Sequence, residues 1–173
     1  MMADVFRHFY DYHFNENRNV WDTYIGPLSD EQFTQDVSYS HGSVRNQIVH
    51  LMSVDDAWFS GLRGVEISNS LDPATLVDRP VIRAHWDAVE QRMREYLAEL
   101  RDETLFEKPF PEGEDKDLIA WQVLLQVANH GTDHRAQLLR LLNDLGVKTV
   151  SQDYIFYVYD HPALDLAQKG REK

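Results

Sequence analysis

Two histidines four residues apart, His130 and His134, stand within the most apolar helical pattern of the chain. In a helix, residues i and i+4 lie one turn apart on the same face, with Cβ atoms about 6 Å apart. Two imidazole nitrogens at that spacing can converge on one metal ion about 2 Å from each. Taken alone, the pair fits a metal site and a pair of hydrogen-bonded core histidines equally well. Gly131 follows the first histidine, which excludes the HExxH helix of zinc proteases, where a glutamate at that position is the base.

A third metal ligand has to come from another segment, and His50 is the candidate. It lies about 100° from the centre of the apolar stripe of its own predicted helix, a position that also suits a boundary histidine. The other histidines have no comparable spacing and are expected at the surface or at its boundary: His8, His13, His41, His85 and His161. Among them His13 stands out, because it shares a helical face with three aromatic residues.

Four long segments with helical periodicity have to position these side chains, and they predict an all-α four-helix bundle. They span residues 4–24, 43–63, 80–101 and 117–145, the last beginning at Asp117 or Leu118. Ser43 is a predicted N-cap, Pro80 suits a first helical turn, and Gly146 suits a helix end. Residues 104–117 predict a loop, with a short hairpin as the alternative. The aromatic tail DYIFYVYDHP predicts either a strand or a short helix packed on the bundle.

The length of the chain predicts one domain over residues 1–173, and its composition excludes several classes of function. The chain contains no cysteine, which excludes disulfides, thiolate ligands and a cysteine nucleophile. With 29 acidic and 17 basic residues, the net charge is -12, which disfavours nucleic-acid binding. No window approaches the roughly 20 apolar residues that span a bilayer, so we expect a cytoplasmic protein with no membrane association.

Three segments together with NENRNVW near the amino terminus resemble the DinB/YfiT-like superfamily of four-helix-bundle metalloenzymes. In chain order they are SVRNQIVHLMSVDDAWFSGL, NHGTDHRAQLL and LGVKTVSQDYIFY. The resemblance covers essentially the whole chain. It implies a divalent metal ion held by His50, His130 and His134, with open coordination positions for water or substrate.

The resemblance also implies activities known in the superfamily, namely transfer of low-molecular-weight thiols and thiol-dependent isomerisation, and it implies a homodimer. The chain departs from the usual pattern at three positions near the proposed ligands. Members often carry histidine where this chain has Gln126 and Asp133, and glycine where it has Ala136. These departures leave the three ligands in place and alter the polarity of the pocket.

Three neutral imidazoles leave a divalent ion with its full positive charge, which lowers the pKa of a bound water or thiol. The expected function is therefore a metal-dependent thiol S-transferase or hydrolase acting on a small-molecule substrate. Zinc and nickel are the favoured metals, and iron and copper are compatible with imidazole ligands. The alternative is a non-enzymatic, stress-related metal-binding helical protein or interaction module.

Further polar residues lie near the predicted ligands along the chain. Asp55 could orient a ligand histidine through its second ring nitrogen, or it could be a buried carboxylate paired with an arginine or a helix terminus. Gln137 could bind substrate or make a structural hydrogen bond, and Arg135 is expected to point away and make a structural ion pair. Tyr154 in the aromatic tail could cover the pocket or belong to the packed core.

Metal binding by histidines also predicts a pH dependence. The ordinary pKa of histidine is about 6.5, so protons compete with the ion for all three ligands below roughly pH 6 to 6.5. We expect the metal to stabilise the fold at neutral pH and to lose this effect on acidification, whereas the metal-free protein lacks the steep acid dependence.

Overall fold

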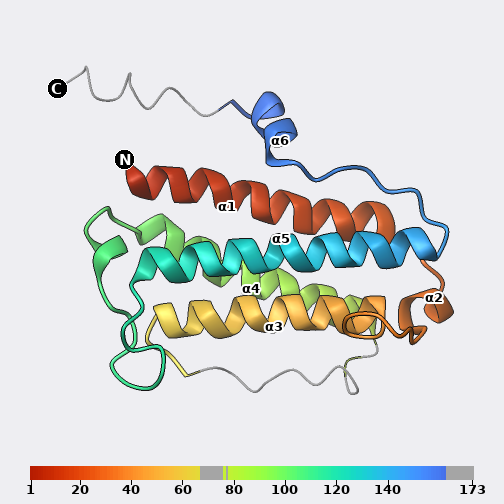
Figure 1. Cartoon of the computed structure of the whole chain (residues 1–173), viewed down its shortest axis with the longest axis horizontal. Coiled ribbons are helices and arrows are strands. Elements are labelled where there is room, and N and C mark those ends of the chain that lie inside the picture. The colour runs from red at the N-terminus through yellow and green to blue at the C-terminus, as the bar shows by residue number, and fades with distance from the viewer. Residues whose placement is uncertain (67–75, 77, 163–173) are drawn as a thin grey trace.

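The computed structural model describes residues 1–66, 76 and 78–162, and those residues form helices and loops with no strand among them (Figure 1). In chain order the elements are α1 (Met2–Asn19), η1 (Val20–Ile25), α2 (Asp30–Thr34), α3 (Val44–Leu62), α4 (Arg79–Glu99), η2 (Thr104–Phe106), α5 (Ala120–Asp144) and α6 (Tyr154–Asp160). The long helices α1, α3, α4 and α5 form the bundle, in which α1 and α3 each pack against both α4 and α5. The prediction of an all-α helical bundle is confirmed.

The helix ends follow the local capping chemistry. Ser43 caps α3 as predicted, because its Oγ accepts a hydrogen bond from the backbone N–H of Asn46 at 3.1 Å. Helix α5 begins at Ala120, later than predicted. The side-chain oxygen of Gln122 accepts a hydrogen bond from the backbone N–H of Ile119, which caps the helix at that point. It ends before Gly146, whose φ of +83° suits glycine. The 104–117 segment forms the short 3₁₀ helix η2 and turns, so the hairpin alternative is wrong.

The core consists of the apolar stripes that the four long helices turn toward one another. Full burial of one large apolar side chain in this core stabilises the fold by about 1.5–3 kcal/mol. Its fully buried members include Tyr10, Ile48, Leu51, Met52, Ile82, Val123, Leu124, Val127, Leu138 and Leu142. The hydroxyl of Tyr10 donates to the carbonyl oxygen of Leu124 at 2.8 Å, which satisfies the polar end of this buried ring.

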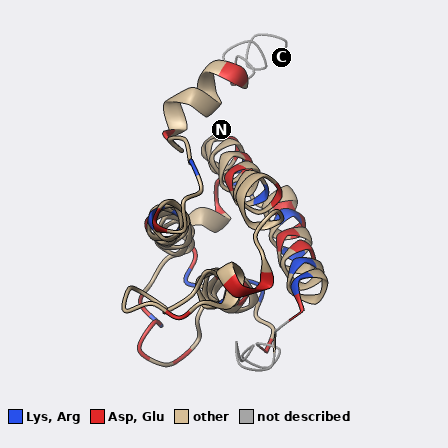
Figure 2. Ribbon diagram, turned by 90° about the vertical axis from the view of Figure 1, so that its right-hand side faces the viewer, with Lys and Arg blue, Asp and Glu red and all other residues tan. Residues whose placement is uncertain are grey.

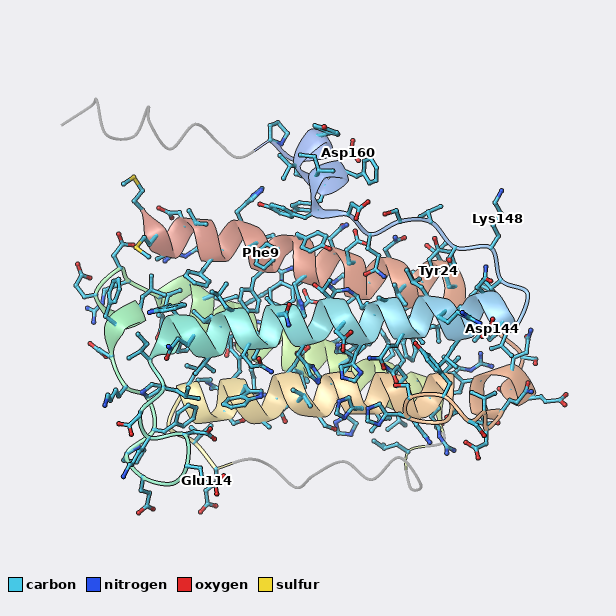
Figure 3. The ribbon with its side chains drawn as sticks, viewed as in Figure 1. Phe9, Tyr24, Glu114, Asp144, Lys148 and Asp160 are labelled. Carbon is cyan, nitrogen blue, oxygen red and sulfur yellow. The ribbon has the colours of Figure 1, made fainter. Side chains whose placement is uncertain are left out.

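The aromatic tail forms the short helix α6, which lies outside the bundle beside α1 (Figure 1). None of its residues is buried, and it contacts the bundle through Tyr154 and Tyr157. The ring of Tyr154 meets the ring of Phe9 edge to face at 5.2 Å, and Figure 3 shows Phe9 on the stretch of α1 that lies below α6. The tail is therefore a helix packed on the bundle rather than a strand.

Acidic and basic residues are interspersed along the helices rather than gathered by sign (Figure 2). Several pair across elements, for example Arg92 with Asp56 at 2.6 Å and Arg18 with Glu90 at 2.7 Å. No helix in the part of the chain that the structure describes is long and apolar enough to cross a membrane.

Candidate metal centre

Helices α3 and α5 bring together the three histidines that the sequence analysis selected. His130 and His134 lie one turn apart on α5 and face His50 on α3, and all three are half-buried. The Nε2 atoms of His50 and His130 are 3.1 Å apart. The ring centre of His134 lies 4.5 Å from that of His50 and 4.2 Å from that of His130. The long contact between α3 and α5 therefore brings three imidazole rings next to one another.

A fourth imidazole belongs to the same group. The ring of His41 stacks on the ring of His50 with centres 3.9 Å apart, and it lies 5.3 Å from His134. One ring nitrogen each of His41, His50 and His134 lie within 4.8 Å of one another. We call His41, His50, His130 and His134 the histidine cluster. His41 is exposed, as expected of a surface histidine, but the sequence analysis did not foresee that its ring packs against His50.

A tight turn between α2 and α3 positions His41. The backbone N–H of Val37 donates to the carbonyl of Gly42 at 2.6 Å, and Gly42 has a φ of +88° that favours glycine. Ser40 has a φ of +51°, which is uncommon for a residue with a side chain. The side chain of Asn46, in the first turn of α3, donates to the carbonyl of His41 at 3.0 Å. These bonds fix the turn above the first part of α3.

The donor set fits a divalent metal ion. Two nitrogens that each lie about 2.1 Å from one ion are about 3.0–3.4 Å apart, for right-angled to tetrahedral geometry. The 3.1 Å between the Nε2 atoms of His50 and His130 falls in that range. Burial, followed by the neighbouring imidazoles, lowers the pKa of His50 to about 4. Burial also lowers the pKa values of His130 and His134, so these rings are neutral at pH 7, the form that binds metal.

Two glutamines border the cluster. The side-chain nitrogen of Gln47, which is fully buried on α3, lies 2.8 Å from Nδ1 of His134 and donates to the carbonyl of His134 at 3.1 Å. Gln137 contacts Ser40 through its Oε1 and donates to Asp133 at 3.0 Å, so its hydrogen bonds are structural here. The sequence analysis did not select Gln47. The sequence feature that could have identified Gln47 is its three-residue spacing from His50, which places both side chains on one side of α3.

Asp55 lies behind the cluster in a buried polar network. Its Oδ2 is 3.4 Å from Nε2 of His13, and its Oδ1 has no hydrogen-bond partner among the described residues. Nδ1 of His130 is likewise buried without a partner in the described part of the chain. The Asp55 charge raises the pKa of His130, an effect smaller than the lowering by burial. Asp55 thus pairs with His13, which is not one of the proposed metal ligands, and not with the arginine or helix terminus that was the predicted alternative.

Arg135 completes this network from α5. Its side chain is fully buried and donates to Nδ1 of His13 at 3.1 Å, to Oδ1 of Asn17 at 2.9 Å and to Oε1 of Gln152 at 2.8 Å. It does point away from the metal ligands, as expected. However, these partners are uncharged, so its structural role is a hydrogen-bond network that ties α5 to α1 and to the C-terminal segment.

Tyr154 does not join the histidine cluster. It lines a hollow of about 700 Å³ between α1, α5 and residues 152–154, together with Phe9, Tyr12 and Trp121. A second hollow of about 500 Å³ on α5 reaches His130. The two hollows share three lining residues, which are Gln126, Asn129 and Thr132. The surface beside the cluster is therefore continuous with an aromatic depression to which Tyr154 contributes.

A known protein family matches nearly the whole chain. The family model described as the DinB family matches residues 1–169. No curated protein matches the chain. Because the match spans nearly the full length and includes all four members of the histidine cluster, the chain belongs to the DinB family.

Proposed function

We propose that the protein binds one divalent metal ion through His50, His130 and His134 and uses it in a reaction on a small molecule. The observation that carries this proposal is the 3.1 Å separation of the Nε2 atoms of His50 and His130. The ring centre of His134 lies 4.5 Å from that of His50 and 4.2 Å from that of His130. The lowered pKa values of all three rings support the proposal, because a neutral imidazole offers its lone pair without first losing a proton. Zinc and nickel are the favoured ions.

The reaction class is transfer or hydrolysis, of the thiol S-transferase or hydrolase type. A bound divalent ion lowers the pKa of a water or thiol and polarises a substrate oxygen. The chain has no cysteine, so any thiol comes from a separate molecule of low molecular weight. The hollow of about 500 Å³ on α5 is lined by one proposed ligand, His130, and its volume suits a small substrate.

The alternative is a non-enzymatic metal-binding, stress-related helical protein or interaction module. The presence of a fourth imidazole in the cluster favours it, because four histidines can fill a tetrahedral site and leave no open position. The two functions differ in one measurable property. A catalytic centre admits an outside ligand at the metal, whereas a closed structural centre does not.

Elemental analysis of untagged protein, purified without a nickel column, tests the metal part of the proposal. We expect about one divalent ion per chain, and we expect the His134→Ala variant to lose it. Full metal content in a variant with alanine at positions 50, 130 and 134 would overturn the assignment. An activity screen of the loaded protein with and without low-molecular-weight thiols then tests the reaction class.

We further propose that the protein is a homodimer. Support comes from apolar side chains that are exposed on α5 and α6, among them Leu125, Ile155, Phe156 and Tyr159. Light scattering at micromolar concentration distinguishes a dimer from a monomer.

A further inference from the structure

We infer that His41 is a fourth metal ligand that an incoming molecule displaces, so the turn that carries it opens and closes the metal centre. This inference rests on the proposed metal site and goes beyond it, because the three ligands proposed above all come from long helices. His41 comes from the turn between α2 and α3 instead. The centre then has a closed form with four imidazoles and an open form with three.

The position of the His41 ring supports a ligand role. It stacks on the His50 ring, with 22° between the planes and 3.9 Å between the centres, so one of the two rings has to tilt before both nitrogens face one ion. Its nitrogen lies within 4.8 Å of ring nitrogens of both His50 and His134. The nitrogens of His41, His50 and His134 therefore form one group, and Nε2 of His130 adjoins it 3.1 Å from Nε2 of His50. A tetrahedral divalent ion takes four such ligands.

The four imidazole rings differ in how firmly the surrounding structure holds them in place. His50, His130 and His134 are half-buried on helices of 19 and 25 residues, whose backbones are fixed by packing in the core. His41 is exposed and belongs to a turn in which Ser40 has a left-handed backbone. Such a conformation costs a non-glycine residue about 1 kcal/mol or more, which lowers the cost of rearranging the turn. Of the four, His41 is the ligand that can leave without disturbing the bundle.

Displacement is a simple ligand exchange. The bond from the ion to the His41 nitrogen breaks, and a bond to a thiolate, water or other donor of the incoming molecule forms. Until that exchange the ion has no open position, so the turn protects the centre from adventitious ligands.

Cobalt substitution tests the inference without any enzyme assay. Four-coordinate Co²⁺ absorbs visible light several-fold more strongly than five- or six-coordinate Co²⁺, so the spectrum reports whether a fourth imidazole is bound. We expect a strong four-coordinate spectrum for the wild-type protein. His41→Phe keeps a ring in the stack on His50 but has no nitrogen, and we expect its spectrum to weaken as water takes the position. His85→Ala, an exposed histidine on α4, is the control and should match the wild type.

Azide serves as the outside ligand in a second measurement. We expect azide to bind cobalt in His41→Phe more tightly than in the wild type, because no histidine has to be displaced. Added imidazole should restore the four-coordinate spectrum of His41→Ala. Identical spectra and identical azide affinities for wild type and His41→Phe would overturn the role of His41. Loss of cobalt from the wild-type protein itself would instead overturn the proposed metal site, so the two failures are distinguishable.

Discussion

The side-chain nitrogen of Gln47 on α3 lies 2.8 Å from Nδ1 of His134 on α5, so the two helices hold one proposed ligand ring between them. Partners of this kind fix the orientation of a metal-binding imidazole and determine which nitrogen carries its proton. The same nitrogen donates to the backbone carbonyl of His134 at 3.1 Å, so Gln47 ties both the ring and the backbone of His134 to α3.

Replacement of Gln47 with leucine should therefore weaken metal binding while keeping the fold. We expect the metal affinity to fall about 10- to 100-fold, the usual effect of removing such a partner. Competition with a chelator of known affinity measures it, and circular dichroism checks the helix content. The exposed residue Gln91 on α4 provides the control, and Gln91→Leu should bind metal as the wild type does. Unchanged affinity in Gln47→Leu would show that the amide does not orient His134.

Gly131→Ala should destabilise the protein, although alanine is normally the better helix former by about 1 kcal/mol. A Cβ at position 131 would lie 2.4 Å from Cε1 and 2.9 Å from Nδ1 of His13, which is itself buried and bonded to Arg135. The methyl group must therefore push His13 out of the network. Urea denaturation measures the change in the free energy of unfolding.

A double-mutant cycle isolates the steric cause. In a His13→Ala background the clash is absent, so Gly131→Ala should become neutral or stabilising. If the substitution costs the same free energy in both backgrounds, the close approach of Gly131 and His13 is not its cause.

Arg135→Met should be among the most damaging single substitutions in the chain. It removes hydrogen bonds to His13, Asn17 and Gln152 and leaves their buried polar atoms without a partner. We expect a loss of about 3 kcal/mol or more in the free energy of unfolding. Arg140→Met, on the same helix, is the matched control. Its guanidinium is exposed and pairs with Asp144 at the surface, so its loss should change the free energy of unfolding far less than Arg135→Met does.

The sequence predicted the parts of the site that follow from helical periodicity. His130 and His134 face inward because they share the stripe of α5, and Ser43 begins α3 because its side chain can cap it. His41 could not be found in this way. It lies in a turn, where residue spacing does not determine direction, and the unusual backbone of Ser40 and Gly42 brings its ring over His50.

The buried polar network was missed for another reason. Periodicity shows that Asp55 and His13 lie on inward faces, but it does not show which helices meet. His13 on α1 contacts Asp55 on α3 and accepts a hydrogen bond from Arg135 on α5, and these three residues are far apart in the sequence. The sequence around Arg135 gave no signal that it is fully buried, since arginine is usually exposed.

The last prediction concerns acid, and the structure changes the expectation drawn from the sequence. Burial and neighbouring imidazoles lower the pKa of His50 to about 4, and burial lowers those of His13, His130 and His134. Each of these groups has a folded pKa below its unfolded value of about 6.5. Above pH 6.5 both states are neutral and stability is unaffected. Below pH 6.5 the unfolded state binds protons first, so stability falls until the folded pKa is reached.

The metal-free protein should therefore lose stability between pH 6.5 and about 4, contrary to the expectation from ordinary histidines. Metal affinity should decline at a lower pH than three ordinary histidines would give, because the pKa values of all three ligands are lowered and that of His50 is about 4. Urea denaturation of metal-free protein at pH 7.5, 6 and 5, with NMR titration of the histidine ring signals, measures both effects. A His50 midpoint near 6.5, with equal metal-free stability at all three pH values, would contradict the burial of the His50 ring among neighbouring imidazoles.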